Sequence, residues 1–362
     1  MLRTTIFCWT ILVANWSLVA RNAVHWTALC CLALVLAACS PQLVLDTLRG
    51  QTMGTTWSVT IANLPARYDA TALTSEIEEI LAAVNREMST YDPTSEISRF
   101  NDAPADGVWF FVSDRFAEVT AKALGFAVLS DGAFDPTVGP LVNLWGFGPE
   151  ATAEQLPSDQ AIAAARADVG YQALAVRAPE QGAALSKTAP RQLDLSAIAK
   201  GAGVDAIAEH LITRGLDNFL VDIGGELRAV GQKDGRGWRV AIEQPTKGVR
   251  DVQRIITLSD QAIATSGDYR NYREIDGVSY SHTIDPKTGR PVTHQLASVS
   301  VAADSCTLAD GWATTLLALG PKQGFAFAET RGLAALFIER SGTTLSVRET
   351  TRWMRDFSSE AQ

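Results

Sequence analysis

The stretch DLSAIAKGAGVDAIAEHLITRG, residues 194–215, marks the place where the character of the sequence changes. Before it, apolar residues recur mainly at helical spacing, as they do in 71–89 and 113–132. After it, short runs rich in β-branched and aromatic residues are separated by turn residues, which is typical of strands. The stretch itself begins in a turn and predicts a helix that ends near Gly215. Helices gathered in the first half and strands in the second predict an α+β fold with a largely antiparallel sheet.

The other expected elements are placed by the same patterning. Residues 55–61 alternate in polarity and predict an early strand. Ser113 is the expected N-cap of the second helix, a shorter helix is expected over 159–168, and another over 305–320. The expected strands of the second half are 218–223, 226–232, 238–243, 254–258, 262–267, 278–284, 296–303, 333–339 and 343–348.

The N-terminal segment is not expected to belong to the fold. An apolar run over 26–40 follows Arg21, ends in Leu-Ala-Ala-Cys at Cys39, and is shorter than the roughly 20 residues that a membrane-spanning helix needs. Small residues just before a cysteine resemble a bacterial lipobox, in which Cys39 is lipidated and becomes the new N-terminus. We therefore expect a lipoprotein signal peptide over 1–38, and the alternative is an uncleaved membrane anchor. A second apolar stretch precedes the run, so the expected start codon lies near Arg21.

Cleavage before Cys39 would leave a tether over 39–50, a single large domain over 51–350 and a C-terminal tail over 351–362. The lipid would then hold the domain at a bacterial membrane, facing the periplasm. Ser40 follows the cysteine, in the place of the aspartate that is associated with inner-membrane retention. We expect the inner membrane, with the outer membrane as the alternative.

The composition is that of an ordinary globular protein. The chain has 362 residues, of which 47% are hydrophobic and 20% are charged, and this permits one large domain or two ordinary ones. The net charge of −9 argues against nucleic acid as a partner. After cleavage only Cys39 and Cys306 remain, so no intrachain disulfide is expected, and Cys306 is expected to be a small buried apolar residue.

Two stretches could bring backbone groups close to a ligand. GAFDPTVGPLVNLWGFGP, residues 132–149, is rich in glycine, and a backbone without Cβ atoms can approach a ligand closely. The alternative is a turn-rich loop packed with aromatic residues. In 194–205, Asp194, Ser196 and Lys200 surround a helix start, where free N–H groups and the lysine charge favour phosphate. The alternative is that Asp194 or Ser196 simply caps the helix.

The stretch LADGWATT, residues 308–315, contains a carboxylate and a hydroxyl that share one helix face. Asp310 and Thr314 are four positions apart, so both can point at one hard cation such as Mg²⁺. The alternative is an aspartate that interacts with the helix dipole and a threonine that bonds back to its own helix.

His282 and Asp285 lie at the end of the strand expected over 278–284. Histidine titrates near neutrality and is the usual proton acceptor for a hydroxyl nucleophile, whereas a lone histidine on a strand is more often structural. Asp285 begins a turn sequence, Asp-Pro-Lys-Thr-Gly. The sequence contains no HExxH, CxxC pair, GxSxG or GxxxxGKS/T motif, which argues against zinc proteases, serine hydrolases and P-loop enzymes.

Together, eight stretches in order resemble the ApbE family of bacterial FAD:protein FMN transferases. They cover about 52–320 and are TMGTTWSV, MSTYDPTSEISRFN, GAFDPTVGPLVNLWGFG, DLSAIAKGAGVD, VDIGGEL, AIATSGDYRNY, SHTIDPKTGRPV and ADGWATTLLALG. The resemblance implies an ApbE-like (T-fold-like) α+β domain. It also fits a lipoprotein, since family members are often lipid-anchored. One departure is Ala202, where the family usually has an aromatic residue, so a stacking or packing contact is expected to be missing.

The resemblance implies an activity. The family cleaves FAD, its substrate, with Mg²⁺ as cofactor, transfers the FMN half to a threonine or serine of a target protein, and releases AMP. Carried over by motif, the residues expected to contact FAD are Met53, Tyr91, Ala133, Phe134, Asp135, Asp194, Lys200 and Ile284. The residues expected to hold Mg²⁺ are Asp310, Thr314 and the carbonyl of Ala197, and His282 is the expected catalytic base.

Two alternatives stand beside flavin transfer. One is an FAD pyrophosphatase that gives free FMN and AMP, because the acceptor hydroxyl lies outside this chain. The other is a flavin-binding lipoprotein without catalysis. By family analogy the acceptor would be a membrane subunit of an Na⁺-pumping quinone reductase or of a related electron-transfer complex.

Overall fold

The computed structural model describes residues 43–149, 155–246, 251–268, 272–275, 278–342 and 344–357. The expected signal peptide over 1–38 and Cys39 lie outside these residues. From Leu45 onward the chain forms one compact unit. The segment 39–50 was expected to be a tether, and this is wrong for its second half, because residues 45–50 belong to the first strand of the sheet. Among the described residues, no helix has the length and apolar character needed to cross a membrane.

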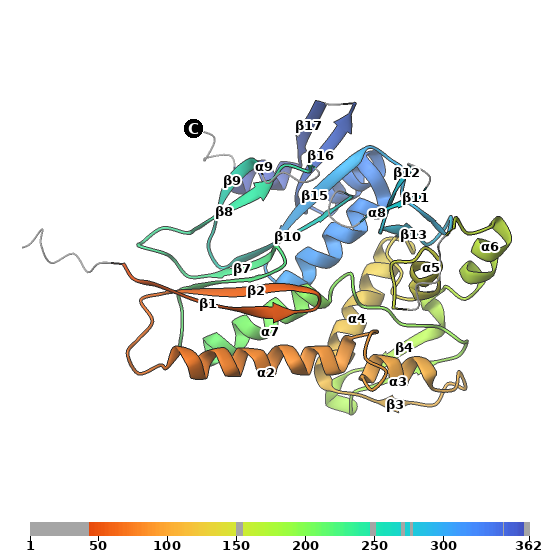
Figure 1. The fold of residues 1–362 in the computed structure, drawn as a ribbon, viewed down its shortest axis with the longest axis horizontal. Helices are drawn as coiled ribbons and strands as arrows, with labels where there is room; N and C mark the ends of the chain where they lie inside the picture. Colours follow the sequence, from red (N-terminus) through yellow and green to blue (C-terminus); the bar gives the residue numbers. More distant parts are fainter. Residues whose placement is uncertain are drawn as a thin grey trace, which may run out of the picture. The chain divides into compact units, whose positions relative to one another are not determined.

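The centre of the unit is a sheet which, within the described residues, has eight strands in the order β1-β2-β6-β7-β10-β15-β16-β17 (Figure 1). All of its neighbouring strands are antiparallel, which confirms the predicted type of sheet. The strands are β1 Leu45–Thr52, β2 Thr55–Ala62, β6 Phe219–Ile223, β7 Glu226–Val230, β10 Gln261–Gly267, β15 Leu296–Ala303, β16 Ala334–Ser341 and β17 Thr344–Glu349. The smaller sheets contain β3 Phe110–Phe111, β4 Leu174–Arg177, β5 Ala184–Lys187, β8 Trp238–Glu243, β9 Val252–Leu258, β11 Tyr272–Ile275, β12 Val278–Ser281, β13 Ile284–Asp285 and β14 Arg290–Pro291.

The helices are α2 Ala70–Met88, α3 Glu96–Asp102, α4 Asp114–Leu129, α5 Gly139–Leu144, α6 Asp159–Ala167, α7 Ala199–Thr213, α8 Cys306–Thr330 and α9 Thr351–Phe357. Five of these helices lie where the sequence predicted them, namely α2, α4, α6, α7 and the first part of α8, whereas α3, α5 and α9 were not predicted. Ser113 caps α4, as predicted, because its hydroxyl accepts a hydrogen bond from Phe116 N at 3.4 Å. Helix α7 was expected to end near Gly215, and it ends two residues earlier, at Thr213.

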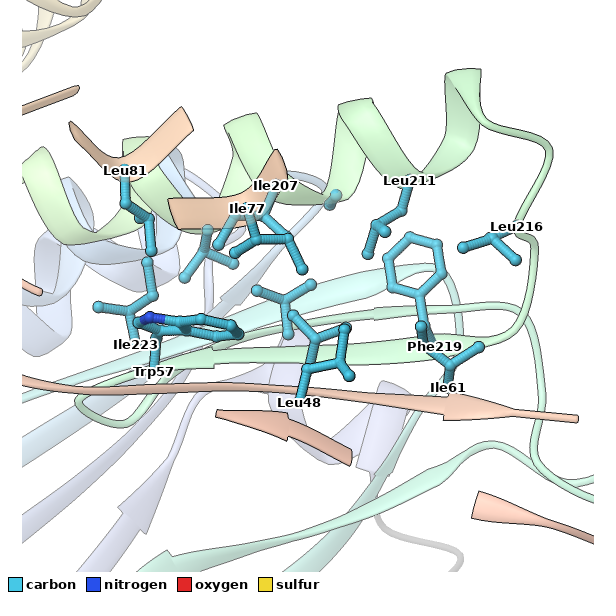
Figure 2. Close-up of a cluster of buried hydrophobic side chains, with 14 of the residues drawn as sticks. Leu48, Trp57, Ile61, Ile77, Leu81, Ile207, Leu211, Leu216, Phe219 and Ile223 are labelled. Carbon is cyan, nitrogen blue, oxygen red and sulfur yellow. The ribbon is translucent and has the colours of Figure 1, made fainter. Parts of the chain in front are cut away.

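One face of the sheet is covered by α7 and α8, and α2 packs against α7. Figure 2 shows the core between this face and the helices, where Trp57 and Ile61 from β2 meet side chains of α2 and α7. The labelled members of this core are Leu48, Trp57, Ile61, Ile77, Leu81, Ile207, Leu211, Leu216, Phe219 and Ile223. The early strand is therefore fixed to the helices by a continuous apolar core.

The other face of the sheet is covered by the β8–β9 hairpin and by α9. Trp353 and Phe357 of α9 are buried in a core with Ile256 of β9 and Leu336 of β16. The expectation of a C-terminal tail over 351–362 is therefore wrong for residues 351–357, which form a packed helix. Residues 358–362 lie outside the described part of the chain.

Helix α8 is interrupted at Gly320 and Pro321, close to the predicted helix end at residue 320. Gly320 has a φ of 77°, a conformation that glycine adopts without strain. Pro321 has no N–H and cannot bond to the carbonyl of Leu317, four residues earlier. His294 forms a hydrogen bond with that carbonyl instead, with Nε2 at 2.7 Å from Leu317 O. His294 therefore has a structural role at the kink.

Candidate active site

The N-terminal end of α7 lies in backbone contact with α8. A Cβ on Gly201 would lie 2.5 Å from the carbonyl oxygen of Cys306, so only glycine permits this approach. At this crossing Gly201 N donates to Asp310 Oδ2 at 3.0 Å. Asp310 is 3% exposed, and its carboxylate faces the positive end of the α7 dipole. Burial raises the pKa of Asp310, while Lys200 and the Gly201 N–H oppose that shift.

Neither Asp194 nor Ser196 caps α7. The N-cap position is Ile198, which provides no side-chain hydrogen bond. Asp194 Oδ1 accepts from Ser196 N at 2.8 Å and from the Ser196 hydroxyl, so the two residues form a turn just before the helix. The cap interpretation of these residues is therefore wrong, and the first turn of α7 faces Asp310 instead.

A buried aspartate one turn further along α7 fixes the position of α8. Asp205 accepts hydrogen bonds from Cys306 N and Thr307 N, both at 2.9 Å, and from Thr307 Oγ1 at 2.6 Å. Arg228 Nη1 of β7 also donates to it, at 2.7 Å. Because this contact holds the first turn of α8, it sets where Asp310 lies one turn later. Cys306 is fully buried, as predicted.

Thr314 turns its hydroxyl away from its own helix. Its Oγ1 lies 3.5 Å from the carbonyl oxygen of Ala197 and 3.2 Å from Ser266 Oγ of β10. The next residue, Thr315, does bond back to Gly311 O at 2.7 Å, which shows the pattern that Thr314 avoids. The hydroxyl of Thr314, the carbonyl of Ala197 and the carboxylate of Asp310 thus come from the facing ends of α7 and α8.

Lys200 lies between two buried carboxylates. Its Nζ is 3.6 Å from Glu226 Oε1, and Glu226, at the start of β7, is 5% exposed. Burial by itself would lower the pKa of Lys200, but the charges of Asp310 and Glu226 outweigh burial and raise it. Burial raises the pKa of Glu226, and the ammonium of Lys200 opposes that shift. At neutral pH Lys200 is therefore a charged ammonium held inside the site.

Sequence reasoning did not single out Glu226 or Ser266. Glu226 follows the Gly-Gly turn in VDIGGEL, and Ser266 lies in AIATSG, at the end of a strand. A polar residue beside a glycine turn is a weak signal by itself. Only the pairing of β7 and β10 in the sheet brings both residues to α7 and α8.

A second group of predicted residues meets at the end of the loop 132–149, whose middle part is helix α5. Tyr91, 68% exposed, donates its hydroxyl to the carbonyl of Phe147 at 3.3 Å. The ring of Phe147 lies edge-on to the ring of His282, with 6.4 Å between centroids. His282 does not lie within a continuous strand over 278–284, because β12 ends at Ser281 and β13 begins at Ile284. The histidine therefore lies in the short bend between them.

The other predicted residues of this loop are turned inward. Phe134 packs on Phe126 with ring centroids 5.4 Å apart, and Ala133 is also buried. Asp135 accepts from Thr137 N at 2.8 Å, from Thr137 Oγ1 at 2.6 Å and from Tyr171 N at 3.2 Å. Burial raises the pKa of Asp135, against these hydrogen bonds. The side chains of this segment thus shape the loop.

Ile284 and Met53 belong to two hairpins. Ile284 is buried in a core with Leu141 and Trp145. Met53 occupies the β1–β2 turn with a φ of 49°, followed by Gly54 at 70°, the positive values that two-residue hairpin turns require. A Cβ on Gly203 would lie 3.2 Å from Met53 Cε, so Met53 rests on α7.

The loop joins the two groups. Near its start, Asp194 N donates to the carbonyl of Pro136 at 2.7 Å, and near its end Phe147 contacts His282. The structure therefore brings Asp194, Ala197, Lys200, Asp310 and Thr314 together at the ends of α7 and α8, and Tyr91 with His282 around Phe147. Ala202 is buried in a core with Phe126, Phe134 and Leu195.

The donor set at α7 and α8 suits a hard cation. In the described part of the chain, no group of three or more His, Cys, Asp or Glu residues could hold a metal ion. The candidate donors are instead one carboxylate, one hydroxyl and one carbonyl, the oxygen ligands that Mg²⁺ accepts while retaining waters or phosphate oxygens. Asp310 has one hydrogen bond among the described residues, through Oδ2, so its other oxygen is available.

A family model described as the ApbE family matches residues 53–337. A Vibrio cholerae protein named FAD:protein FMN transferase is 45% identical over 319 residues, which cover 88% of this chain and 94% of that protein. The solved structure of the flavin transferase ApbE from Vibrio cholerae superposes with a TM-score of 0.79 at 43% identity, covering 87% of this chain and all of that one. The apo flavinyl transferase ApbE from Pseudomonas stutzeri gives a TM-score of 0.79 at 40% identity, over 87% and 98% of the two chains.

Proposed function

The chain belongs to the ApbE family and is an FAD:protein FMN transferase, and we propose that its reaction takes place where the ends of α7 and α8 meet the loop 132–149. The acceptor is a threonine or serine hydroxyl of a target protein. Its oxygen forms a bond to the phosphorus on the FMN side of FAD, and the bond from that phosphorus to the bridging oxygen breaks. The bridging oxygen leaves with AMP, and the hydroxyl proton passes to a base. The products are a phosphoester-linked FMN and AMP.

Three oxygens would hold Mg²⁺ in this site. They are an Asp310 carboxylate oxygen, Thr314 Oγ1 and the Ala197 carbonyl, of which the last two already lie 3.5 Å apart. When bound, the cation would neutralise charge on the diphosphate and on the departing AMP. These three donors are hard oxygen atoms and one of them is a carboxylate, which is the ligand type that Mg²⁺ prefers.

Lys200 would supply a second positive charge to the diphosphate. Its ammonium is held at the same end of α7 as Asp310, and a raised pKa keeps it charged. Asp194 lies in the turn just before α7 and contacts the loop 132–149, so it would orient the nucleotide from the opposite side. These two residues bind and orient, and no covalent step involves them.

His282 is the proposed base, and Tyr91 and Met53 the proposed contacts of the flavin. His282 lies in a bend and its ring contacts the ring of Phe147, whose carbonyl accepts the hydroxyl of the exposed Tyr91. The Tyr91 ring would stack on the isoalloxazine, and His282 would accept the proton of the acceptor hydroxyl. Ala133, Phe134, Asp135 and Ile284 would shape the pocket through the loop they support.

The observation that carries this proposal is the convergence of Ala197, Lys200, Asp310 and Thr314 from two sequence stretches more than a hundred residues apart. The decisive experiment incubates the protein with FAD and a candidate target, with Mg²⁺ or with EDTA. Flavin fluorescence that stays with the target on a denaturing gel, only with Mg²⁺ and only with the acceptor hydroxyl intact, is the expected result.

The same experiment separates the two alternatives. Free FMN and AMP without a labelled target would indicate an FAD pyrophosphatase. FAD that remains intact with Mg²⁺ and target would indicate a flavin-binding protein without catalysis. Labelling that is unchanged in EDTA would remove Mg²⁺ from the mechanism.

We further propose that the enzyme is lipid-anchored through Cys39 at a bacterial membrane and faces the periplasm, with the inner membrane favoured over the outer. The support is the apolar leader and the small residues before Cys39. Its acceptor would then be a membrane electron-transfer subunit. Cys39→Ala should move the enzyme from the membrane fraction to the soluble one, and an unchanged distribution would contradict the anchor.

A further inference from the structure

Glu226 is a buried carboxylate that the fold leaves half unsatisfied. It is 5% exposed, and its Oε2 has no hydrogen-bond partner among the described residues. Its Oε1 lies 3.6 Å from Lys200 Nζ, which is longer than a strong charge-assisted hydrogen bond. Leaving a carboxylate oxygen buried and unpaired is costly, so such a group calls for an explanation beyond stability.

The local backbone places Glu226 firmly. Gly224 and Gly225 have φ values of 65° and 104°, and Gly225 N donates to Asp222 Oδ1 at 2.8 Å. A Cβ on Gly224 would lie 3.0 Å from Thr55 Cγ2 and 3.5 Å from Glu226 Oε2. The turn is therefore packed against β2, and it presents Glu226 to α7 as the first residue of β7.

Lys200 has two carboxylates near it, those of Asp310 and Glu226. In the proposed reaction the carboxylate of Asp310 would bind the cation. Burial lowers the pKa of Lys200, and Asp310 and Glu226 together reverse that shift. If Asp310 binds the cation, Glu226 is the carboxylate that remains for Lys200 among the described residues. Direct contact of Glu226 with the diphosphate would be repulsive, so its effect must pass through the ammonium.

We propose that Glu226 is a positioning residue that holds the Lys200 ammonium toward the diphosphate of FAD. This inference rests on the proposed function. The unpaired Oε2 gives the carboxylate capacity for a second hydrogen bond from Nζ when a bound anion draws the ammonium into a new position. Glu226 therefore acts on FAD binding only through Lys200.

A double-mutant cycle tests this dependence. FAD affinity is measured by flavin fluorescence titration in EDTA, and again with Mg²⁺, for the full chain, Glu226→Gln, Lys200→Met and the double variant. Glu226→Gln should weaken FAD binding by about tenfold, because the ammonium loses the carboxylate that holds it toward the diphosphate. In the Lys200→Met background the same change should have almost no effect.

The matched control is Glu209→Gln. Glu209 lies on α7 like Lys200, but its side chain is 70% exposed and its ion pair to Arg228 is long, at 3.8 Å. This variant should bind FAD like the unmodified protein. Melting curves of all variants establish that they are folded, and Glu226→Asp replaces Glu226→Gln if the latter does not fold.

The outcomes are distinct. Additive losses in the cycle, or unchanged FAD affinity in Glu226→Gln, would overturn the positioning role. If Glu209→Gln weakened FAD binding as much as Glu226→Gln does, the effect would be one of general charge. That result would also overturn the positioning role. Failure of the proposed function would appear separately, as unmodified protein that neither binds FAD nor labels a target.

Discussion

Two buried polar regions lie side by side along α7, and they are built in opposite ways. In the α7–α8 junction, defined by Asp205, Arg228, Cys306 and Thr307, Asp205 accepts hydrogen bonds at 2.6–2.9 Å from all three partners. In the polar cluster, defined by Lys200, Glu226, Asp310 and Thr314, the contacts are longer or missing. Lys200 and Glu226 are 3.6 Å apart, and Glu226 Oε2 has no partner among the described residues.

The difference separates stability from function. A buried carboxylate with every lone pair engaged stabilises the helix it caps, because its desolvation is compensated. Buried groups with unused hydrogen-bonding capacity destabilise the free protein and become satisfied when a ligand arrives. The junction therefore fixes where α8 begins, and the polar cluster retains unused hydrogen-bonding capacity for a substrate.

The largest effect is expected from breaking the junction. Asp205→Ala would leave Arg228 and the first N–H groups of α8 without their acceptor. The free energy of unfolding should fall by about 3–5 kcal/mol, the usual cost of removing one partner of a buried pair. Chemical denaturation measures it, with Glu209→Ala as the exposed control on the same helix. A loss below about 1 kcal/mol, typical of an exposed pair, would mean that the junction is not structural.

The next largest effect is expected in the polar cluster, where a substitution should lower the rate of FMN transfer without lowering stability. Asp310→Ala is expected to reduce FMN transfer at least about 10³-fold, because a cation ligand that supplies several kcal/mol to the transition state is removed. Its unfolding midpoint should be unchanged or higher, since a buried carboxylate near Glu226 disappears. Transfer is measured across a Mg²⁺ titration. A normal Mg²⁺ titration in this variant would show that Asp310 is not a ligand.

His282→Ala should slow transfer and spare FAD binding. A general base contributes about 10²–10⁴-fold, and this is the expected loss of transfer rate. FAD affinity should stay within about twofold, a difference below 0.5 kcal/mol. The contrasting variant is His294→Ala, which removes the bond to Leu317 O at the α8 kink and should lower stability while the transfer rate remains. Equal transfer rates in the two variants would remove His282 from the reaction.

The smallest effect is expected at Ser266, which refines the comparison. If Thr314 Oγ1 and the Ala197 carbonyl both turn toward the cation, the Thr314 proton needs another acceptor, and Ser266 Oγ lies at 3.2 Å. Ser266→Ala should weaken Mg²⁺ binding about fivefold, the equivalent of one hydrogen bond of about 1 kcal/mol.

The readout for Ser266 is the rise in melting temperature that Mg²⁺ produces, which does not depend on activity. Thr265→Val is the matched control, because Thr265 points to the other face of β10 and pairs with Ser300 at 2.7 Å. It should change stability but not the response to Mg²⁺. If Ser266→Ala and Thr265→Val responded equally to Mg²⁺, Ser266 would have only a structural role.

The sequence by itself determined much of the local structure. Helical periodicity and the Ser113 cap located α4, and the apolar pattern of 194–215 located α7, because these signals depend on residues a few positions apart. The ordered motifs identified the family and pointed to Lys200, His282, Asp310 and Thr314.

Tertiary structure alone decided the rest, since pairing and burial depend on residues far apart in the chain. Residues 45–50 became a strand because β2 pairs with them, and 351–357 became a helix because Trp353 packs on the sheet. Glu226 and Ser266 joined the site because antiparallel pairing places β7 and β10 beside α7 and α8. No local sequence pattern marks either residue as functional. The role of each depends on the groups that the fold places beside it.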